Sequence, residues 1–125
     1  MLRVGTVVVG VEDLDRAMAF WTGALDYVPK RAVGPDDDFV ILVPASGDGA
    51  HIALGVSETP VQEHPRVHLD LYAGDAADQA AEAERLIALG ATRVDWDLYP
   101  VDPDFVVLAD PEGNRFCVID TSWGG

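Results

Sequence analysis

The chain has one cysteine, few basic residues and no long apolar run, and each shortage excludes a class of protein. A single cysteine among 125 residues forms no intramolecular disulfide and no cysteine-based zinc cluster. Only 8 lysine and arginine residues stand against 22 aspartate and glutamate residues, which gives a formal net charge of −14. Because that charge repels a phosphate backbone, we expect no nucleic-acid partner.

Membrane and leader segments are also missing from the pattern. No apolar stretch approaches the roughly 20 residues of a membrane-spanning helix, and Met1–Val4 leads directly into a strand pattern. We therefore expect no membrane association and no signal peptide, and we predict a cytoplasmic protein. The glycines of Gly47–Gly49 are followed by no helix, so phosphate-loop and dinucleotide chemistry are not indicated.

Two β-hairpins are the strongest local signals. Apolar runs on both sides of the Pro111–Asn114 turn predict a hairpin over Phe105–Asp120. A similar hairpin is expected over Phe39–Val56, so that Phe39 and Phe105 are 66 residues apart, and Ile52 and Phe116 are 64 apart. The nearly constant offset indicates an internal duplication.

The other elements repeat in the same order. Helical spacing of apolar residues predicts helices over Leu14–Leu25 and Ala76–Leu89, with Asp13 and Asp75 as N-caps. An offset of 62 residues aligns these caps and also aligns Thr6 with His68. The remaining strands are expected over Arg3–Val11, Tyr27–Val33, Arg66–Tyr72 and Ala91–Trp96.

Each half thus has the order β-α-β-β-β. We predict an α+β protein in which two tandem βαβββ modules form a curved mixed sheet around a cleft. The single domain comprises module 1 over residues 1–57, a proline-containing linker over 58–65 and module 2 over 66–125.

Three segments carry a resemblance to a known superfamily. The stretch Val11–Trp21, the strand Val67–Asp70 and the turn Asp110–Asn114 resemble the glyoxalase / bleomycin resistance / extradiol dioxygenase superfamily, also called vicinal oxygen chelate. The segments starting at His68 and Asp110 are most similar to its glyoxalase-like subgroup, common in high-GC bacteria. The superfamily includes lyases, isomerases, dioxygenases and drug-binding proteins, so the fold alone does not choose a function.

The resemblance implies four metal-ligand positions, which fall on Thr6, Ala53, His68 and Cys117. Only His68 is a typical ligand there, and a catalytic zinc normally takes about three protein ligands. Cys117, between two apolar neighbours, is interpreted as a small buried residue in preference to a reactive thiolate. This pattern favours a protein without a metal or other cofactor.

A non-standard metal site is the alternative. Period-two geometry places His51 on the face of Ala53, and Asp70 on the face of His68. A cleft that joins His51, His68, Asp70 and Cys117 would suit Zn, Ni, Mn or Fe and would support a lyase, isomerase or dioxygenase. An exposed position beside a glycine-rich loop is the simpler interpretation of His51.

Without a metal, His68 and Asp70 are candidates for ligand hydrogen bonding or acid–base catalysis. The alternative is a structural histidine whose imidazole forms a hydrogen bond with a neighbouring backbone carbonyl or carboxylate. Trp21 is expected in the core, whereas Trp96 and Tyr99 are candidates for the wall of an apolar pocket.

The preferred hypothesis is a metal-independent cleft that binds an aromatic or amphipathic molecule for sequestration or resistance. The resemblance to drug-binding members implies a homodimer. The sequence does not decide whether the protein is an enzyme, or whether it keeps the fold without a tight ligand. The expected ligand-binding residues are Thr6, His51, Ala53, His68, Asp70, Trp96, Tyr99 and Cys117.

Overall fold

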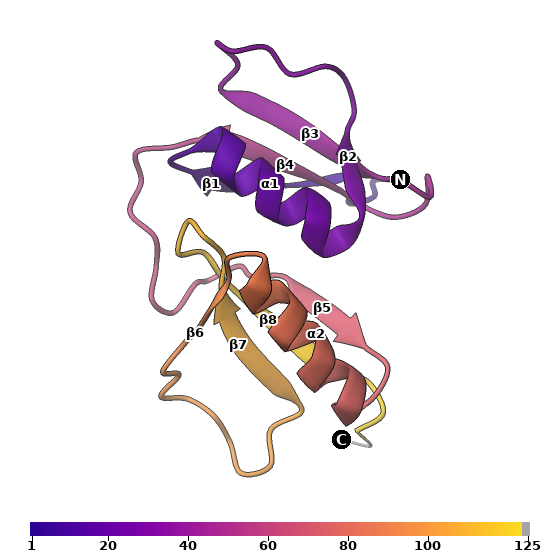
Figure 1. The fold of residues 1–125 in the computed structure, drawn as a ribbon, viewed down its shortest axis with the longest axis vertical. Helices are drawn as coiled ribbons and strands as arrows, with labels where there is room; N and C mark the ends of the chain where they lie inside the picture. Colours follow the sequence, from indigo (N-terminus) through magenta and orange to yellow (C-terminus); the bar gives the residue numbers. More distant parts are fainter. Residues whose placement is uncertain (124–125) are drawn as a thin grey trace. The chain divides into compact units, whose positions relative to one another are not determined.

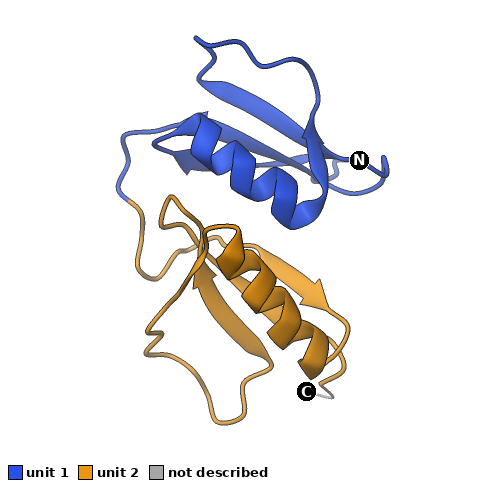
Figure 2. Ribbon diagram, viewed as in Figure 1, with its two compact units in different colours: residues 1–60 blue, residues 61–125 orange. Residues whose placement is uncertain are grey.

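The chain folds into two helices and two four-stranded mixed sheets (Figure 1) in a computed structural model that describes residues 1–123. The predicted α+β class and the tandem βαβββ order are confirmed. The chain divides into two compact units (Figure 2), unit 1 over residues 1–60 and unit 2 over residues 61–125. The division falls within the segment 58–65 that was expected to be a linker. No helix in the described part of the chain is long and apolar enough to cross a membrane.

Unit 1 contains a mixed sheet in the order β1-β4-β3-β2, with β1 parallel to β4. Helix α1 buries five residues, Leu14, Ala17, Phe20, Trp21 and Ala24, which confirms the prediction that Trp21 belongs to the core. Its N-cap is Asp13, whose side chain accepts a hydrogen bond from the Arg16 amide at 3.1 Å. The elements are β1 (Thr6–Val11), α1 (Leu14–Leu25), β2 (Tyr27–Pro29), β3 (Phe39–Pro44) and β4 (His51–Val56).

Unit 2 repeats this arrangement in the order β5-β8-β7-β6, with β5 parallel to β8. Gln79 of the helix ties it to the sheet, because its Nε2 donates to the carbonyls of Asp104 and Val118 at 3.0 Å each. The elements are β5 (Asp70–Ala73), α2 (Ala76–Ala88), β6 (Thr92–Arg93), β7 (Phe105–Ala109) and β8 (Arg115–Asp120).

The duplication is visible in the strand register. Val8 pairs with Ala53 in unit 1, and Asp70 pairs with Cys117 in unit 2. Val8 and Asp70 are 62 residues apart, and Ala53 and Cys117 are 64 apart, close to the offsets that relate the two halves of the sequence. The two modules therefore place these residues at equivalent positions of their own sheets.

Several strands are shorter than the sequence suggested. The strand expected from Arg66 begins at Asp70, and the one expected from Arg3 begins at Thr6. The strand expected over Ala91–Trp96 is only Thr92–Arg93, and the one expected over Tyr27–Val33 ends at Pro29. The last two lie at sheet edges, where each has a single neighbour and the ladder ends when the chain leaves that neighbour.

The turn between β7 and β8 determines where β8 begins. Asp110 is only 2% exposed, and its Oδ1 accepts hydrogen bonds from the amides of Glu112 and Asn114 at 2.9 Å each. Gly113 has a φ of 88°, a left-handed conformation that glycine adopts without a steric penalty. This local network reverses the chain as the sequence predicted.

The buried Asp110 carboxylate gives a stability prediction. Replacement by alanine leaves two turn amides without their acceptor, so we expect Asp110→Ala to lower the free energy of unfolding by about 1–3 kcal/mol. Urea denaturation followed by circular dichroism measures the change. The exposed Asp95→Ala provides the control, and equal stability of the two variants would contradict the structural role of the Asp110 side chain.

Candidate small-molecule site in unit 2

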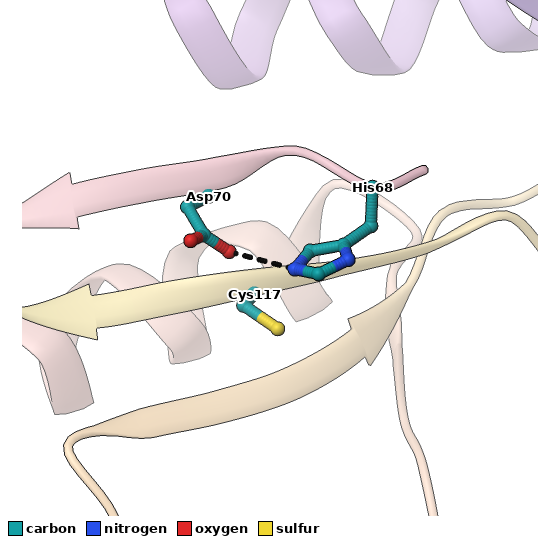
Figure 3. Close-up of side chains that lie close together, drawn as sticks. All are labelled: His68, Asp70 and Cys117. Carbon is teal, nitrogen blue, oxygen red and sulfur yellow. Dashed lines mark ion pairs between the residues drawn. The ribbon is translucent and has the colours of Figure 1, made fainter. Parts of the chain in front are cut away.

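Three polar side chains of unit 2 gather where β5 and β8 run side by side (Figure 3). The Nε2 atom of His68 lies 3.0 Å from Oδ1 of Asp70, and these side chains are 43% and 46% exposed. Asp70 is the register partner of Cys117 on β8. The candidate ligand atoms of His68, Asp70 and Cys117 all lie within 4.8 Å of one another.

The thiol of Cys117 is held in its protonated form. Burial raises its pKa from an ordinary 9.0 to about 11, and the nearby charges of Asp70 and Asp104 and a hydrogen bond with Asp70 add to the effect. The residue is 8% exposed. At neutral pH Cys117 therefore presents a neutral, weakly polar group.

A cavity of about 200 Å³ adjoins this cluster, and all residues around it belong to unit 2. Its wall is mainly apolar, with imidazole, guanidinium and thiol groups at separate points. The residues that line the cavity come from the segment before β5, the loop between β6 and β7, and strands β7 and β8. The lining consists of His64, Pro65, His68, Trp96, Leu98, Val107, Arg115, Phe116 and Cys117.

Trp96 is the aromatic part of the wall. Its ring lies 4.9 Å from the imidazole ring of His64, and the guanidinium carbon of Arg115 lies 6.0 Å from its centroid. Tyr99, which was also expected in the wall, does not line the cavity. Its hydroxyl instead accepts a hydrogen bond from the Val107 amide at 2.7 Å, and its ring lies 5.2 Å from Phe105, so it holds the loop against β7.

Two polar lining residues, His64 and Arg115, were missed from the sequence. Arg115 lies two residues before Cys117 on β8, and the strand period alone would have placed it on the same face. Its Nη1 donates to the Glu63 carbonyl at 2.6 Å. The Nε2 of His64 lies 2.7 Å from Oδ1 of Asp97, and this hydrogen bond lowers the pKa of the Asp97 carboxyl. No local pattern marks His64.

The other expected site residues lie in unit 1. Thr6 pairs with His51 at the start of the β1–β4 ladder, and Ala53 is fully buried beside Val8. At the positions equivalent to Asp70 and Cys117, unit 1 thus has only apolar side chains. The cluster found in unit 2 consists of His68, Asp70 and Cys117, and it does not include His51.

These three groups meet the requirements of a metal site only in part. Imidazole, carboxylate and thiolate are ligands for zinc or iron, and three is the usual number at a catalytic zinc. A metal would have to displace the Cys117 proton, which the surrounding burial and carboxylates retain, and to replace the contact between His68 and Asp70.

Three solved structures of other proteins share this architecture. A glyoxalase-related enzyme from Fulvimarina pelagi is 17% identical with a TM-score of 0.69, and covers 95% of this chain and 88% of its own. A glyoxalase/bleomycin resistance protein/dioxygenase family enzyme from Burkholderia phytofirmans is 16% identical with a TM-score of 0.71, and the match covers 94% of this chain and 97% of that enzyme. A third structure is a mutant of the fosfomycin resistance protein FosX from Listeria monocytogenes, complexed with Mn(II) and 1S,2S-dihydroxypropylphosphonic acid. It is 16% identical with a TM-score of 0.72, and the match covers 95% of this chain and 92% of FosX.

At these identities the likeness is one of fold. A family model described as a glyoxalase-like domain matches residues 6–119. The chain therefore belongs to the glyoxalase-like domain family, as the sequence resemblance indicated. No curated protein matches this chain.

The raised pKa of Cys117 predicts slow alkylation. A rise from 9.0 to about 11 lowers the thiolate fraction near pH 8 roughly 100-fold, so iodoacetamide should react at least that much more slowly with the native protein than with the protein in urea. Asp70→Asn removes a negative charge that favours the thiol and should increase the native rate, as measured by mass spectrometry between pH 7 and 11. Asp97→Asn is the charge-matched control, and an equal increase there would show that Asp70 has no specific effect.

Proposed function

We propose that this protein binds a small aromatic or amphipathic molecule in the cavity of unit 2 without a metal ion. The observation that carries the proposal is the mainly apolar cavity of about 200 Å³ with Trp96 in its wall and a few separated polar groups. Cavities of this composition are typical of small-molecule sites, because the apolar wall supplies affinity and the polar groups fix the orientation.

The polar cluster supplies hydrogen bonding at one point of the cavity. His68 lines the cavity and is in contact with Asp70, so the carboxylate orients the imidazole toward one tautomer. The neutral Cys117 thiol adds a polarisable surface beside it. This arrangement suits a ligand that has a hydroxyl or carbonyl group on an apolar body.

The biological role that we propose is sequestration of such a molecule, with a resistance function, by a cytoplasmic homodimer. Support comes from the resemblance to drug-binding members of the superfamily. Metal independence is supported by the protonated thiol of Cys117. It is also supported by unit 1, which has the apolar residues Val8 and Ala53 at the positions equivalent to Asp70 and Cys117.

A divalent-metal-dependent lyase, isomerase or dioxygenase is the second candidate. It is favoured by the close approach of His68, Asp70 and Cys117, whose possible ligand atoms lie within 4.8 Å of one another. The similar fold of the FosX mutant, which was complexed with Mn(II), shows that this architecture accommodates a metal in another protein.

Metal content separates the two candidates. After overnight dialysis we expect elemental analysis to find far less than one equivalent of metal per chain, and calorimetry with Zn²⁺, Ni²⁺, Mn²⁺ or Fe²⁺ to show no saturable binding. The physical reasons are the Cys117 thiol proton, which a metal would have to displace, and the contact between His68 and Asp70, which it would have to replace. About one equivalent of metal that is lost together in His68→Ala and Asp70→Ala would overturn the proposal in favour of the second candidate.

Ligand binding in the cavity depends on Trp96. For an aromatic compound found by thermal-shift screening, Trp96→Ala should weaken binding about tenfold, because the loss of one aromatic contact and its buried area is worth about 1.4 kcal/mol or more. Titration calorimetry measures the change. Trp123→Ala is the matched control, since Trp123 also belongs to unit 2 and does not line the cavity. Equal losses in both variants would place the ligand elsewhere.

A further inference from the structure

We infer that the ligand is a monocyclic aromatic acid, with its ring in the apolar part of the cavity beside Trp96 and its carboxylate bound by Arg115. This inference rests on the proposed function and specifies the chemical class of the ligand. It follows from the size of the cavity, the setting of Arg115 and the distribution of charge around it.

The cavity volume matches a ligand with about one ring. An apolar cavity of about 150 Å³ holds one benzene molecule. The cavity of unit 2 measures about 200 Å³, which leaves room for one small substituent beyond such a ring. A fused or polycyclic molecule would extend outside it. The apolar residues Leu98 and Val107 and the indole of Trp96 provide the surface against which a planar ring packs.

Arg115 is held in position for an acidic group. Its Nη1 donates to the Glu63 carbonyl at 2.6 Å, and its guanidinium carbon lies 6.0 Å from the centroid of the Trp96 ring. These two contacts restrict the side chain, yet within residues 1–123 only one of the five guanidinium N–H donors forms a hydrogen bond. A carboxylate can accept two parallel hydrogen bonds from such a guanidinium, which gives both affinity and orientation.

Of the basic side chains that line the cavity, Arg115 is the one without a carboxylate partner among the residues that the structure describes. The two lining imidazoles already have carboxylate partners, His64 at 2.7 Å from Asp97 and His68 at 3.0 Å from Asp70. Within residues 1–123 no carboxylate forms an ion pair with Arg115. Asp97 feels its charge at longer range, but the Asp97 side chain is 67% exposed and that attraction is screened by solvent.

The net charge of −14 does not prevent an anion from binding here. At physiological ionic strength the Debye length is about 8 Å, so distant surface carboxylates have little effect on a ligand in the cavity. The short contact with Arg115 is made against an apolar wall, where a charge-assisted hydrogen bond is stronger than in water. Local chemistry therefore decides the sign of the preferred ligand.

Benzoate and its neutral isostere benzamide test this directly with the full chain. Titrations are followed by calorimetry and by the NMR resonance of the Trp96 indole N–H. Wild-type protein should bind benzoate at least tenfold more tightly than benzamide. Arg115→Gln, which keeps a hydrogen-bonding side chain without the charge, should abolish that preference, and Arg115→Lys should retain part of it. Arg93→Gln is the control, because Arg93 pairs with Glu84 and does not line the cavity.

The outcomes separate this inference from the function on which it rests. Equal or tighter binding of benzamide by the wild type, or an unchanged benzoate preference in a folded Arg115→Gln protein, would overturn the inference alone. If none of benzoate, benzamide and the neutral monocyclic compound phenol shifts the Trp96 resonance, the proposed cavity function fails as well. Should Arg115→Gln not fold, Arg115→Lys still decides, since an unaltered preference there contradicts the need for a guanidinium fork.

Discussion

The parallel pairing of β5 with β8 is the constraint on which the site depends. It joins two strands that are distant in sequence, and its first register pair brings the Asp70 carboxylate beside the Cys117 thiol. His68 lies two residues before Asp70 on the same side, and its imidazole contacts that carboxylate. Arg115, directly after the turn that Asp110 stabilises, is placed by the antiparallel pairing of β8 with β7, in which its register partner is Ala109.

The duplication supplied two equivalent frameworks, and only one has this polar chemistry. In unit 1 the corresponding register pair is Val8 with Ala53, and Thr6 occupies the position equivalent to His68. The backbone pairing is the same in both units, so the difference lies in side chains. The architecture is thus maintained by ladder geometry and core packing, whereas the chemistry depends on a few positions that the fold leaves free to vary.

Local signals explain which elements could be predicted. The start of α1 and the turn at Pro111–Asn114 followed from capping and turn residues that act within a few positions of themselves. The strand expected over Ala91–Trp96 was too long because its extent depends on its partner β7 and not on its own sequence. His64 was missed because a cavity arises from contacts between distant segments, whereas the strand period of β8 could have indicated Arg115. Tyr99 lies outside the lining of this cavity because its hydroxyl accepts a hydrogen bond from the Val107 amide, a contact that its own sequence neighbourhood does not reveal.

The loop between β6 and β7 provides Trp96 and Leu98 to the cavity and is attached to the sheet by the Tyr99 hydroxyl. Neither lining residue belongs to a helix or strand, so neither contributes to the strand ladders or to helix α2. Natural variation, or a library randomised at these two positions with Tyr99 retained, can therefore change ligand preference at little cost to folding. In this protein the evolvable part of the site is separate from the part that maintains the structure.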